Sequence, residues 1–227
     1  MSQSKYLETI YNLKSTPFSN YPKKLIKYLF NRYQMKKDQK ILEIGCGRGE
    51  FLNEFINLGL DGYGVDLSDF SEKFFQNLNF KKVDMSNDKL PYEDNFFDII
   101  YSKSFIEHFY YPDKIFQEAY RVLKPGGIII TLTPEWKYIY KSFYDDFTHR
   151  SPFTKTSLAD IHTMNEFRSV RVESFIQLPI LFEKNIFTNF FLMMSYMTRI
   201  LIPDYFRMKN KWIRFSKEIM LLSSAKK

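Results

Sequence analysis

A short apolar strand pattern runs directly into three glycines at alternate positions. Residues 41–49 are Ile-Leu-Glu-Ile-Gly-Cys-Gly-Arg-Gly, so Gly45, Gly47 and Gly49 follow the expected strand. A tight strand-to-helix turn needs residues without Cβ, because the chain adopts dihedrals that strain other residues and approaches a ligand closely. Asp66 ends the next apolar strand, where a carboxylate can accept both hydroxyls of a ribose. These residues predict a site for a nucleoside cofactor.

The spacing of the glycines indicates which cofactor. A dinucleotide fingerprint needs a glycine three residues after Gly47, and that position is Glu50, whose charged side chain would face a pyrophosphate. The spacing therefore argues against a nicotinamide-dependent oxidoreductase. Glu43 together with the Gly45–Gly49 turn resembles the first motif of the class I S-adenosylmethionine-dependent methyltransferases. The resemblance implies S-adenosyl-L-methionine as the cofactor.

Further motifs that resemble this family follow in the family's order between residues 38 and 135. Asp84 and Met85 close a short strand, where the family holds the adenine amino group. Residues 97–102 are similar to the fourth strand, whose end faces the methionine part of the cofactor, and residues 121–132 are similar to the Pro-Gly-Gly turn into the fifth strand. The cofactor-binding residues that the resemblance implies are Glu43, Gly45, Cys46, Gly47, Gly49, Asp66, Leu67, Asp84, Met85 and Ser102.

Some of these signals also have a structural interpretation. A single Asp at a strand end is often only the cap of a turn or helix, and Asp84 has this alternative. Pro125, Gly126 and Gly127 are interpreted as scaffold, because Pro presets the turn and Gly supplies a positive φ. A cofactor-binding subunit without catalysis also stays open, since a fold alone does not determine activity.

Alternating strand and helix patterns predict βαβ units with right-handed crossovers. Together with this pattern, the family resemblance implies an α/β fold with a Rossmann-like seven-stranded mixed sheet, helices on both faces and the last strand antiparallel. The cofactor should lie across the carboxyl ends of strands one, two and four. The expected strands span residues 40–45, 62–66, 81–84, 97–102, 128–133, 170–178 and 218–225. The expected helices include residues 19–33, 50–58 and 154–167.

The 227 residues fit a single methyltransferase domain with additions. We divide the chain into a helical cap at 1–37, a cofactor-binding core at 38–178, a helical insertion or lid at 179–215 and a final strand at 216–227. The cap and the insertion are where we expect substrate choice to be made.

The cysteine count and the N-terminus predict the compartment. Cys46 is the one cysteine, and no Cys or His residues have metal-ligand spacing, so we expect a metal-free fold in a reducing environment. Residues 1–10 are polar and charged rather than apolar, which indicates no export signal. We therefore expect a cytoplasmic protein.

The net charge of +7 is unevenly distributed. Residues 1–40 hold nine Lys or Arg against two acidic residues, and residues 199–227 hold eight against two, which leaves −6 for the middle of the chain. An acidic middle suits a sulfonium cofactor. Basic flanks favour an anionic partner, such as a phosphorylated substrate, a membrane surface or a nucleic acid, although a solvated basic surface is an equal alternative.

Residues 185–202 are apolar over nearly the length of a membrane span, but polar residues and Arg199 interrupt them. We expect an amphipathic lid helix that packs onto the sheet or onto a second copy in a homodimer. Peripheral membrane contact through residues 185–214 is the alternative. The basic residues that would assist it are Arg207, Lys209, Lys211 and Arg214.

Methyl transfer to a hydroxyl requires a group that holds the nucleophile in line and removes its proton. Residues 145–154 follow strand five, and in this segment Asp145 and Asp146 precede His149 by four and three residues, the spacing of one face of a helical turn. We predict His149 as the base, oriented by these acids. His108 is the alternative. His162, within a helix pattern, is interpreted as a surface or packing residue. The predicted substrate contacts are His108, Tyr144 and Arg150.

The acceptor class is argued from two local patterns. Residues 102–105 lack the Asn or Asp followed by two prolines and an aromatic residue that nucleic-acid amino methyltransferases carry, and no RNA-binding module is recognisable, so we expect no nucleic-acid substrate. Residues 146–149, Asp-Phe-Thr-His, resemble a segment of family members that methylate glycans and lipid-linked intermediates. We therefore favour O-methylation of a sugar or lipid-linked glycan, with N-methylation of a small amine as the alternative.

Overall fold

The computed structural model describes residues 17–75, 78–183 and 185–227. A seven-stranded sheet of order β3-β2-β1-β4-β5-β7-β6 forms its centre. All pairings are parallel except those of β7, which runs antiparallel to both β5 and β6. The predicted mixed sheet with an antiparallel last strand is therefore confirmed. The strands are β1 (Lys40–Ile44), β2 (Asp61–Asp66), β3 (Asn79–Lys82), β4 (Phe97–Lys103), β5 (Leu123–Pro134), β6 (Arg168–Phe175) and β7 (Met220–Lys226).

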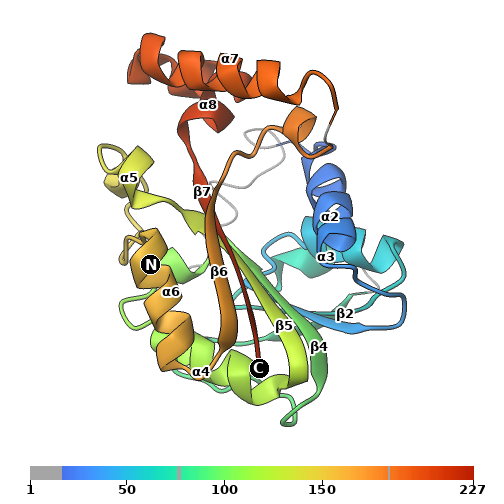
Figure 1. The fold of residues 1–227 in the computed structure, drawn as a ribbon. Helices are drawn as coiled ribbons and strands as arrows, with labels where there is room; N and C mark the ends of the chain where they lie inside the picture. The colour runs from blue at the N-terminus through green and yellow to red at the C-terminus, as the bar shows by residue number, and fades with distance from the viewer. Residues whose placement is uncertain (1–16, 76–77, 184) are drawn as a thin grey trace.

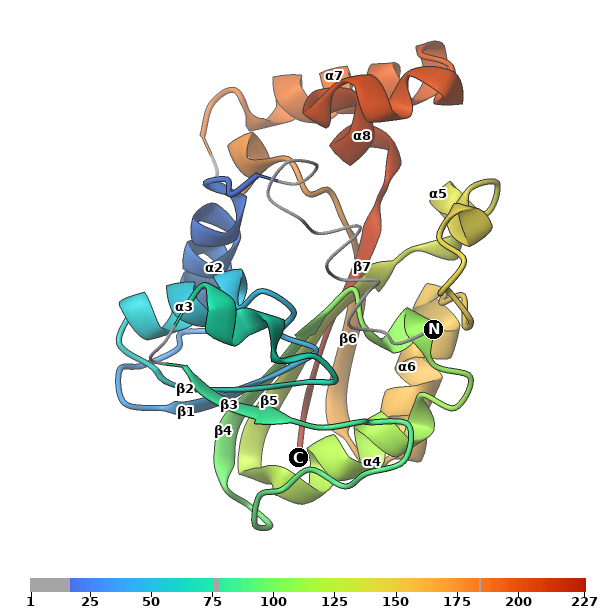
Figure 2. The same cartoon turned by 180° about the vertical axis from the view of Figure 1, so that it is seen from behind.

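Helices cover both faces of the sheet, as predicted (Figures 1 and 2). One face carries α2 (Tyr21–Arg32) and α3 (Glu50–Asn57), whose buried Leu25, Leu29 and Phe55 pack in one apolar core. The other face carries α4 (Asp113–Val122) and α6 (Lys155–Met164), whose apolar residues form the second core. The short helical segments are η1 (Asp69–Lys73), η2 (Ile106–His108), α5 (Trp136–Ile139), η3 (Phe143–Asp145) and η4 (Pro179–Leu181).

Several predicted boundaries differ from the structure, as three strands show. β3 ends at Lys82 rather than at Asp84, because the Asp84 carboxylate caps the turn that follows the strand. β6 ends at Phe175, where the expected strand continued to residue 178. β5 begins at Leu123, before the Pro-Gly-Gly turn rather than after it. His162 is fully buried and shares a hydrogen bond with Ser223, so it is a packing residue and its surface alternative is wrong.

The strand order reverses beside β1, which is where a doubly wound sheet forms a ligand crevice. From β1 the chain proceeds outward to β2 and β3 on one side, and then returns to add β4 and β5 on the other. Loops at the carboxyl ends of β1 and β4 therefore diverge, and ligands of doubly wound sheets bind in such a crevice. The glycine turn follows β1, and η2 follows β4, at this edge.

The carboxy-terminal helices cross one end of the molecule. The chain passes through α7 (Thr188–Leu201), η5 (Asp204–Lys209) and α8 (Lys211–Lys217) before it returns as β7. The helix expected over residues 185–202 is thus present as α7, which lies against α8 (Figure 1). Within the described residues, no helix has the length and apolar character needed to cross a membrane.

Candidate active site

The turn after β1 has the backbone that the glycine pattern predicts. Gly45, Gly47 and Gly49 have φ values of 78°, 51° and 82°, in the left-handed region that favours glycine. A Cβ on Gly45 would lie within 3.0 Å of three ring atoms of Phe105, whereas a Cβ on Gly47 would meet no atom within 4 Å. The turn is therefore packed against the loop after β4 at Gly45 and open at Gly47.

Asp66 holds the turn through its carboxylate. Oδ2 accepts a hydrogen bond from the Gly47 backbone N–H at 2.9 Å, and Oδ1 accepts one from the Ser68 N–H at 3.0 Å. Burial raises the pKa of Asp66, although these backbone donors favour the charged form. The carboxylate at the end of β2 is thus fixed beside the glycine turn, where the ribose contact is predicted.

Glu43 contributes a buried carboxyl group to the crevice. It is 2% exposed, its Oε2 has no hydrogen-bond partner among the described residues, and burial raises its pKa well above the ordinary value. Ser102 lies on the neighbouring strand, but its Oγ donates to the Ile44 carbonyl at 3.1 Å within the sheet. Glu43 therefore has an unpaired polar atom, whereas the hydroxyl of Ser102 is already used in a hydrogen bond within the sheet.

The remaining predicted cofactor residues differ in their surroundings. The Asp84 carboxylate accepts hydrogen bonds from the Ser86 N–H at 2.9 Å and the Asn87 side-chain amide at 3.0 Å, as the turn-cap interpretation expects. Met85 and Cys46 are buried, and burial raises the pKa of the Cys46 thiol well above its usual value. Leu67 is half-buried. The adenine contact of Asp84 stays a prediction.

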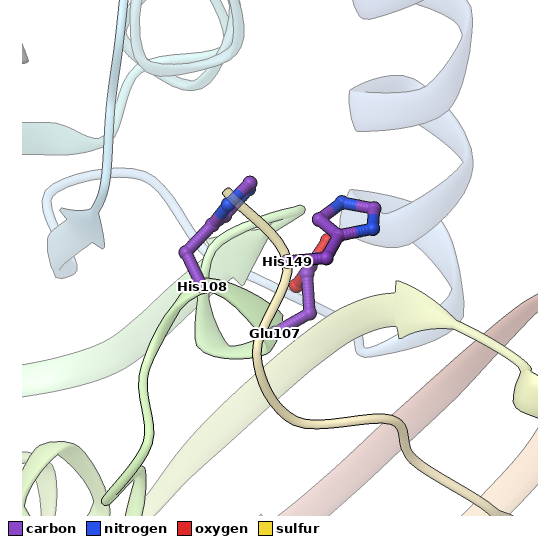
Figure 3. A group of neighbouring side chains, drawn as sticks. All are labelled: Glu107, His108 and His149. Carbon is purple, nitrogen blue, oxygen red and sulfur yellow. The ribbon is translucent and has the colours of Figure 1, made fainter. Parts of the chain in front are cut away.

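Two imidazoles and one buried carboxyl group meet beside this crevice (Figure 3). Glu107 and His108 come from η2, and His149 comes from the loop after η3. The ring centroids of His108 and His149 are 4.9 Å apart. The ring nitrogen Nδ1 of His149 lies 2.6 Å from the Phe143 carbonyl, which can only accept, so Nδ1 carries the proton and Nε2 is free to accept one.

Asp146 contacts the two histidines in a way that the sequence spacing did not predict. η3 ends at Asp145 and Asp146 has extended backbone dihedrals, so His149 is not on a helical turn with them. Its Nε2 is 4.0 Å from Asp146 Oδ2. Asp146 Oδ1 instead accepts from the Thr148 hydroxyl at 2.6 Å, and Thr148 Oγ1 lies 2.8 Å from His108 Nδ1. Asp146 therefore orients His108 through Thr148, while burial lowers the pKa of His108.

Glu107 is a buried acid for which the sequence pattern indicated no role. Its side chain is fully buried, Oε2 accepts from the Thr133 hydroxyl at 3.0 Å, and Oε1 has no partner among the described residues. Burial raises its pKa, and the nearby His149 offsets only part of that rise. Its backbone carbonyl accepts from the Arg150 and Ser151 N–H groups, which binds the histidine loop to η2.

These three residues could also hold a metal ion. One ligand atom from each of Glu107, His108 and His149 lies within 4.8 Å of the others. The expectation of a metal-free fold rested on spacing along the chain, and that spacing could not indicate a group assembled from two separate loops. The cluster could therefore either transfer protons or bind a metal ion.

The predicted substrate residues Tyr144 and Arg150 border the cluster. Tyr144 is exposed beside Phe143. The Arg150 guanidinium donates to the carbonyls of Phe147 and His149 and lies 5.3 Å from the centre of the Tyr110 ring. Tyr144 is therefore accessible to an acceptor, whereas Arg150 also stabilises the histidine loop.

The family comparison covers this crevice. The model of the methyltransferase domain family matches residues 42–131, which include the glycine turn, Asp66 and η2. The resemblance to the class I S-adenosylmethionine-dependent methyltransferases is therefore confirmed for this segment. S-adenosyl-L-methionine is the cofactor of this family, and the open position at Gly47 and the unpaired carboxyl atom of Glu43 fit a cationic ligand at the turn.

Similar proteins extend over different parts of the chain. Phosphoethanolamine N-methyltransferase 3 of Arabidopsis thaliana is 31% identical over 140 residues, which are 52% of this chain and 28% of that protein. Malonyl-[acyl-carrier protein] O-methyltransferase of Marinomonas sp. (strain MWYL1) is 28% identical over 123 residues, 51% of this chain and 46% of that protein. The matched segment thus spans less than half of either relative.

Solved structures match nearly the whole chain. A SAM dependent methyltransferase from Archaeoglobus fulgidus has a TM-score of 0.67 and 23% identity, with 98% of this chain and 99% of that chain covered. This likeness shows the fold. The family match ends at residue 131, so His149 and its loop lie outside it.

Proposed function

We propose that this methyltransferase transfers a methyl group from S-adenosyl-L-methionine to a hydroxyl of a sugar or lipid-linked glycan. The observation that carries the proposal is the position of the Glu107, His108 and His149 cluster. η2 directly follows the end of β4, and Phe105 at its start packs against Gly45 of the cofactor turn. Potential proton acceptors are therefore adjacent to the cofactor crevice.

The reaction needs an acceptor oxygen in line with the methyl group and a base for its proton. The cofactor supplies a methyl group already activated by a sulfonium. Glu43, Gly45, Cys46, Gly47, Gly49, Asp66, Leu67, Asp84, Met85 and Ser102 are the residues that we propose to line its site.

We assign proton acceptance to Nε2 of His149. Because Nδ1 faces the Phe143 carbonyl, Nε2 is the ring nitrogen that keeps a lone pair. In this transfer the acceptor O–H bond would break and its proton would move to Nε2. The oxygen would form a bond to the methyl carbon as the methyl–sulfur bond breaks, and the electron pair of that bond would stay on the sulfur of the departing S-adenosylhomocysteine. Glu107 belongs to the same cluster, and a carboxylate close to an imidazolium stabilises it. We assign Asp146, together with the adjacent Asp145, the role of positioning the loop that carries His149.

The rim of the cluster supports a glycan acceptor. Exposed aromatic side chains with hydroxyl groups border it at Tyr110 and Tyr144. Such side chains combine an apolar face with a polar tip, which suits a ligand that has both kinds of surface. The Asp-Phe-Thr-His sequence at residues 146–149 supports the same class.

N-methylation of a small amine is the second candidate. It is favoured by the similarity to a phosphoethanolamine N-methyltransferase. A neutral amine needs little help with its proton, so this reaction would depend less on His149.

Calorimetric titration tests the cofactor part of the proposal. The protein should bind S-adenosylmethionine and S-adenosylhomocysteine, and it should not bind NAD. Asp66→Asn should weaken cofactor affinity about 10- to 100-fold, because it removes a charged hydrogen-bonding group. Asp160→Asn, which changes an exposed carboxylate on α6, is the matched control and should leave affinity unchanged. Equal affinities of the two variants would remove the role of Asp66.

Turnover separates the two acceptor classes. His149→Asn should retain cofactor affinity and lose roughly 100-fold or more in turnover with a sugar acceptor. A panel of sugar nucleotides, lipid-linked sugars and small amines identifies the acceptor. Turnover with amines alone, unaffected by His149→Asn, would overturn the glycan proposal in favour of N-methylation.

A further inference from the structure

Helix α7 attaches to the protein through its polar side. Ser195 is fully buried and its Oγ donates to Ser216 Oγ of α8 at 3.0 Å. Trp212 Nε1 donates to Thr198 Oγ1 at 3.0 Å, and Arg199 Nε donates to the Ser216 carbonyl at 2.8 Å. The polar stripe of α7 therefore faces α8 and is satisfied there.

The opposite side of α7 is exposed and almost entirely apolar. Asn189 is its one exposed polar residue within the helix, and eight large apolar residues are each between 39% and 64% exposed. They are Phe190, Leu192, Met193, Met194, Tyr196, Met197, Ile200 and Leu201. These eight residues are named the outer face of α7.

This polarity is the inverse of that in an ordinary surface helix, which turns its apolar stripe to the core and its polar residues to water. Monomeric soluble proteins rarely expose a continuous apolar patch of this extent. The outer face extends over the helix, which crosses the end of the molecule with its long axis transverse to β7 (Figures 1 and 2). Contact with an apolar phase would therefore lower the free energy of this face relative to contact with water.

We propose that the outer face of α7 lies in the interfacial region of a membrane that contains anionic lipids. A helix of 14 residues is about 21 Å long, too short to cross a hydrocarbon core of about 30 Å, but long enough to lie in the plane of the interface. Residues 185–214 contain five Lys or Arg and one acidic residue, and Lys211 at the start of α8 is exposed. Anionic headgroups complement this charge.

The same charge argues against a second copy as the occupant. A two-fold contact brings the same surface of both copies together. Basic residues of the segment 185–214 that border such a contact would then oppose their own copies, and like charges across an interface disfavour association. A lipid surface offers the apolar medium without this repulsion.

Membrane docking would orient the active site. α8 leads directly into β7, and Met220 at the start of β7 pairs with Pro134 at the carboxyl end of β5. The glycine turn and η2 follow the carboxyl ends of β1 and β4, parallel strands of the same sheet. The outer face and the cofactor crevice thus lie toward the same end of the sheet, so an acceptor at a membrane surface would be near the crevice.

Vesicle flotation with the full chain tests this inference independently of methyl transfer. The protein should float with vesicles of phosphatidylglycerol and phosphatidylcholine, and more weakly with phosphatidylcholine alone. Phe190→Ser with Met193→Ser should lower the partition coefficient roughly tenfold or more, because two apolar side chains leave the interface. Tyr111→Ser with Met164→Ser is the matched control, because it removes an aromatic residue and a methionine that are more exposed but lie elsewhere.

Three results would overturn the inference. They are no flotation of the wild-type protein, equal loss of flotation in both double variants, and equal binding to charged and neutral vesicles, which would exclude the anionic component. Light scattering on the same samples tests the other occupant. A wild-type dimer that the Phe190→Ser, Met193→Ser variant converts to a monomer, without vesicle binding, would assign the outer face to self-association.

Discussion

Substitution of Gly45 by alanine tests the packing of the cofactor turn in isolation. The backbone at Gly45 has a φ of 78°, which costs an alanine roughly 1–2 kcal/mol, while the loss of unfolded-state entropy returns about 0.4–1 kcal/mol. The new Cβ would also lie within 3.0 Å of three ring atoms of Phe105, and displacing a packed ring costs typically about 1–3 kcal/mol. We expect Gly45→Ala to lower the free energy of unfolding by roughly 2–4 kcal/mol.

Gly126 provides the matched control for this substitution. Its φ is 79°, nearly that of Gly45, but an added Cβ would meet no atom within 4 Å. Gly126→Ala therefore carries the same backbone strain without the clash and should cost about 1 kcal/mol or less. Urea denaturation without cofactor measures both variants, and calorimetry measures S-adenosylmethionine affinity. Equal destabilisation of the two variants, or full affinity in Gly45→Ala, would refute the packing argument.

Two further predictions concern the buried acids. Because burial holds the pKa of Glu43 above 4.5, its stabilising contribution is full below that pH and is lost as the pH rises through the folded-state pKa. In urea titrations, the stability of Glu43→Gln relative to the wild type should therefore increase as the pH rises from about 4 to about 8. The variant should also bind cofactor more weakly. A stability difference that stays constant across this pH range would contradict the burial argument. Dialysis against EDTA should leave turnover unchanged if His149 accepts the proton, whereas a loss restored by Zn²⁺ or Mn²⁺ would assign Glu107, His108 and His149 as metal ligands.

The cofactor crevice was predictable because its signals are local. The positive φ values of Gly45, Gly47 and Gly49 follow from a strand pattern that runs into a turn, and Asp66 is identified by its position at the end of the next strand. The antiparallel last strand came from the family resemblance. These features required no knowledge of contacts between distant loops.

The histidine cluster required tertiary information. Spacing suggested that Asp145 and Asp146 would share a helical face with His149, but η3 ends before that turn forms. Glu107 became part of the cluster because its carbonyl binds the N–H groups of the histidine loop. A signal was available in the adjacent Glu107 and His108 after an apolar strand, although nothing in the spacing connected them to residue 149.

The orientation of α7 was equally hidden. An apolar pattern predicted a helix that packs its apolar side on the sheet or on a second copy. The direction of each side depends on hydrogen bonds between Ser195, Thr198 and Arg199 and residues of α8, and periodicity cannot indicate which stripe turns inward. The helix was therefore predictable and its orientation was not.

The sheet order β5-β7-β6 has a consequence for synthesis on the ribosome. Within the described residues, β6 pairs only with β7, which the chain makes more than forty residues later. While residues 176–219 emerge, β6 has no neighbour and both β5 and β6 present unpaired backbone groups. Such edges are prone to pairing with other chains. The last step of folding is then the insertion of the buried strand β7 between the unpaired edges of β5 and β6. The risk of aggregation should therefore be highest before residues 220–226 leave the ribosome.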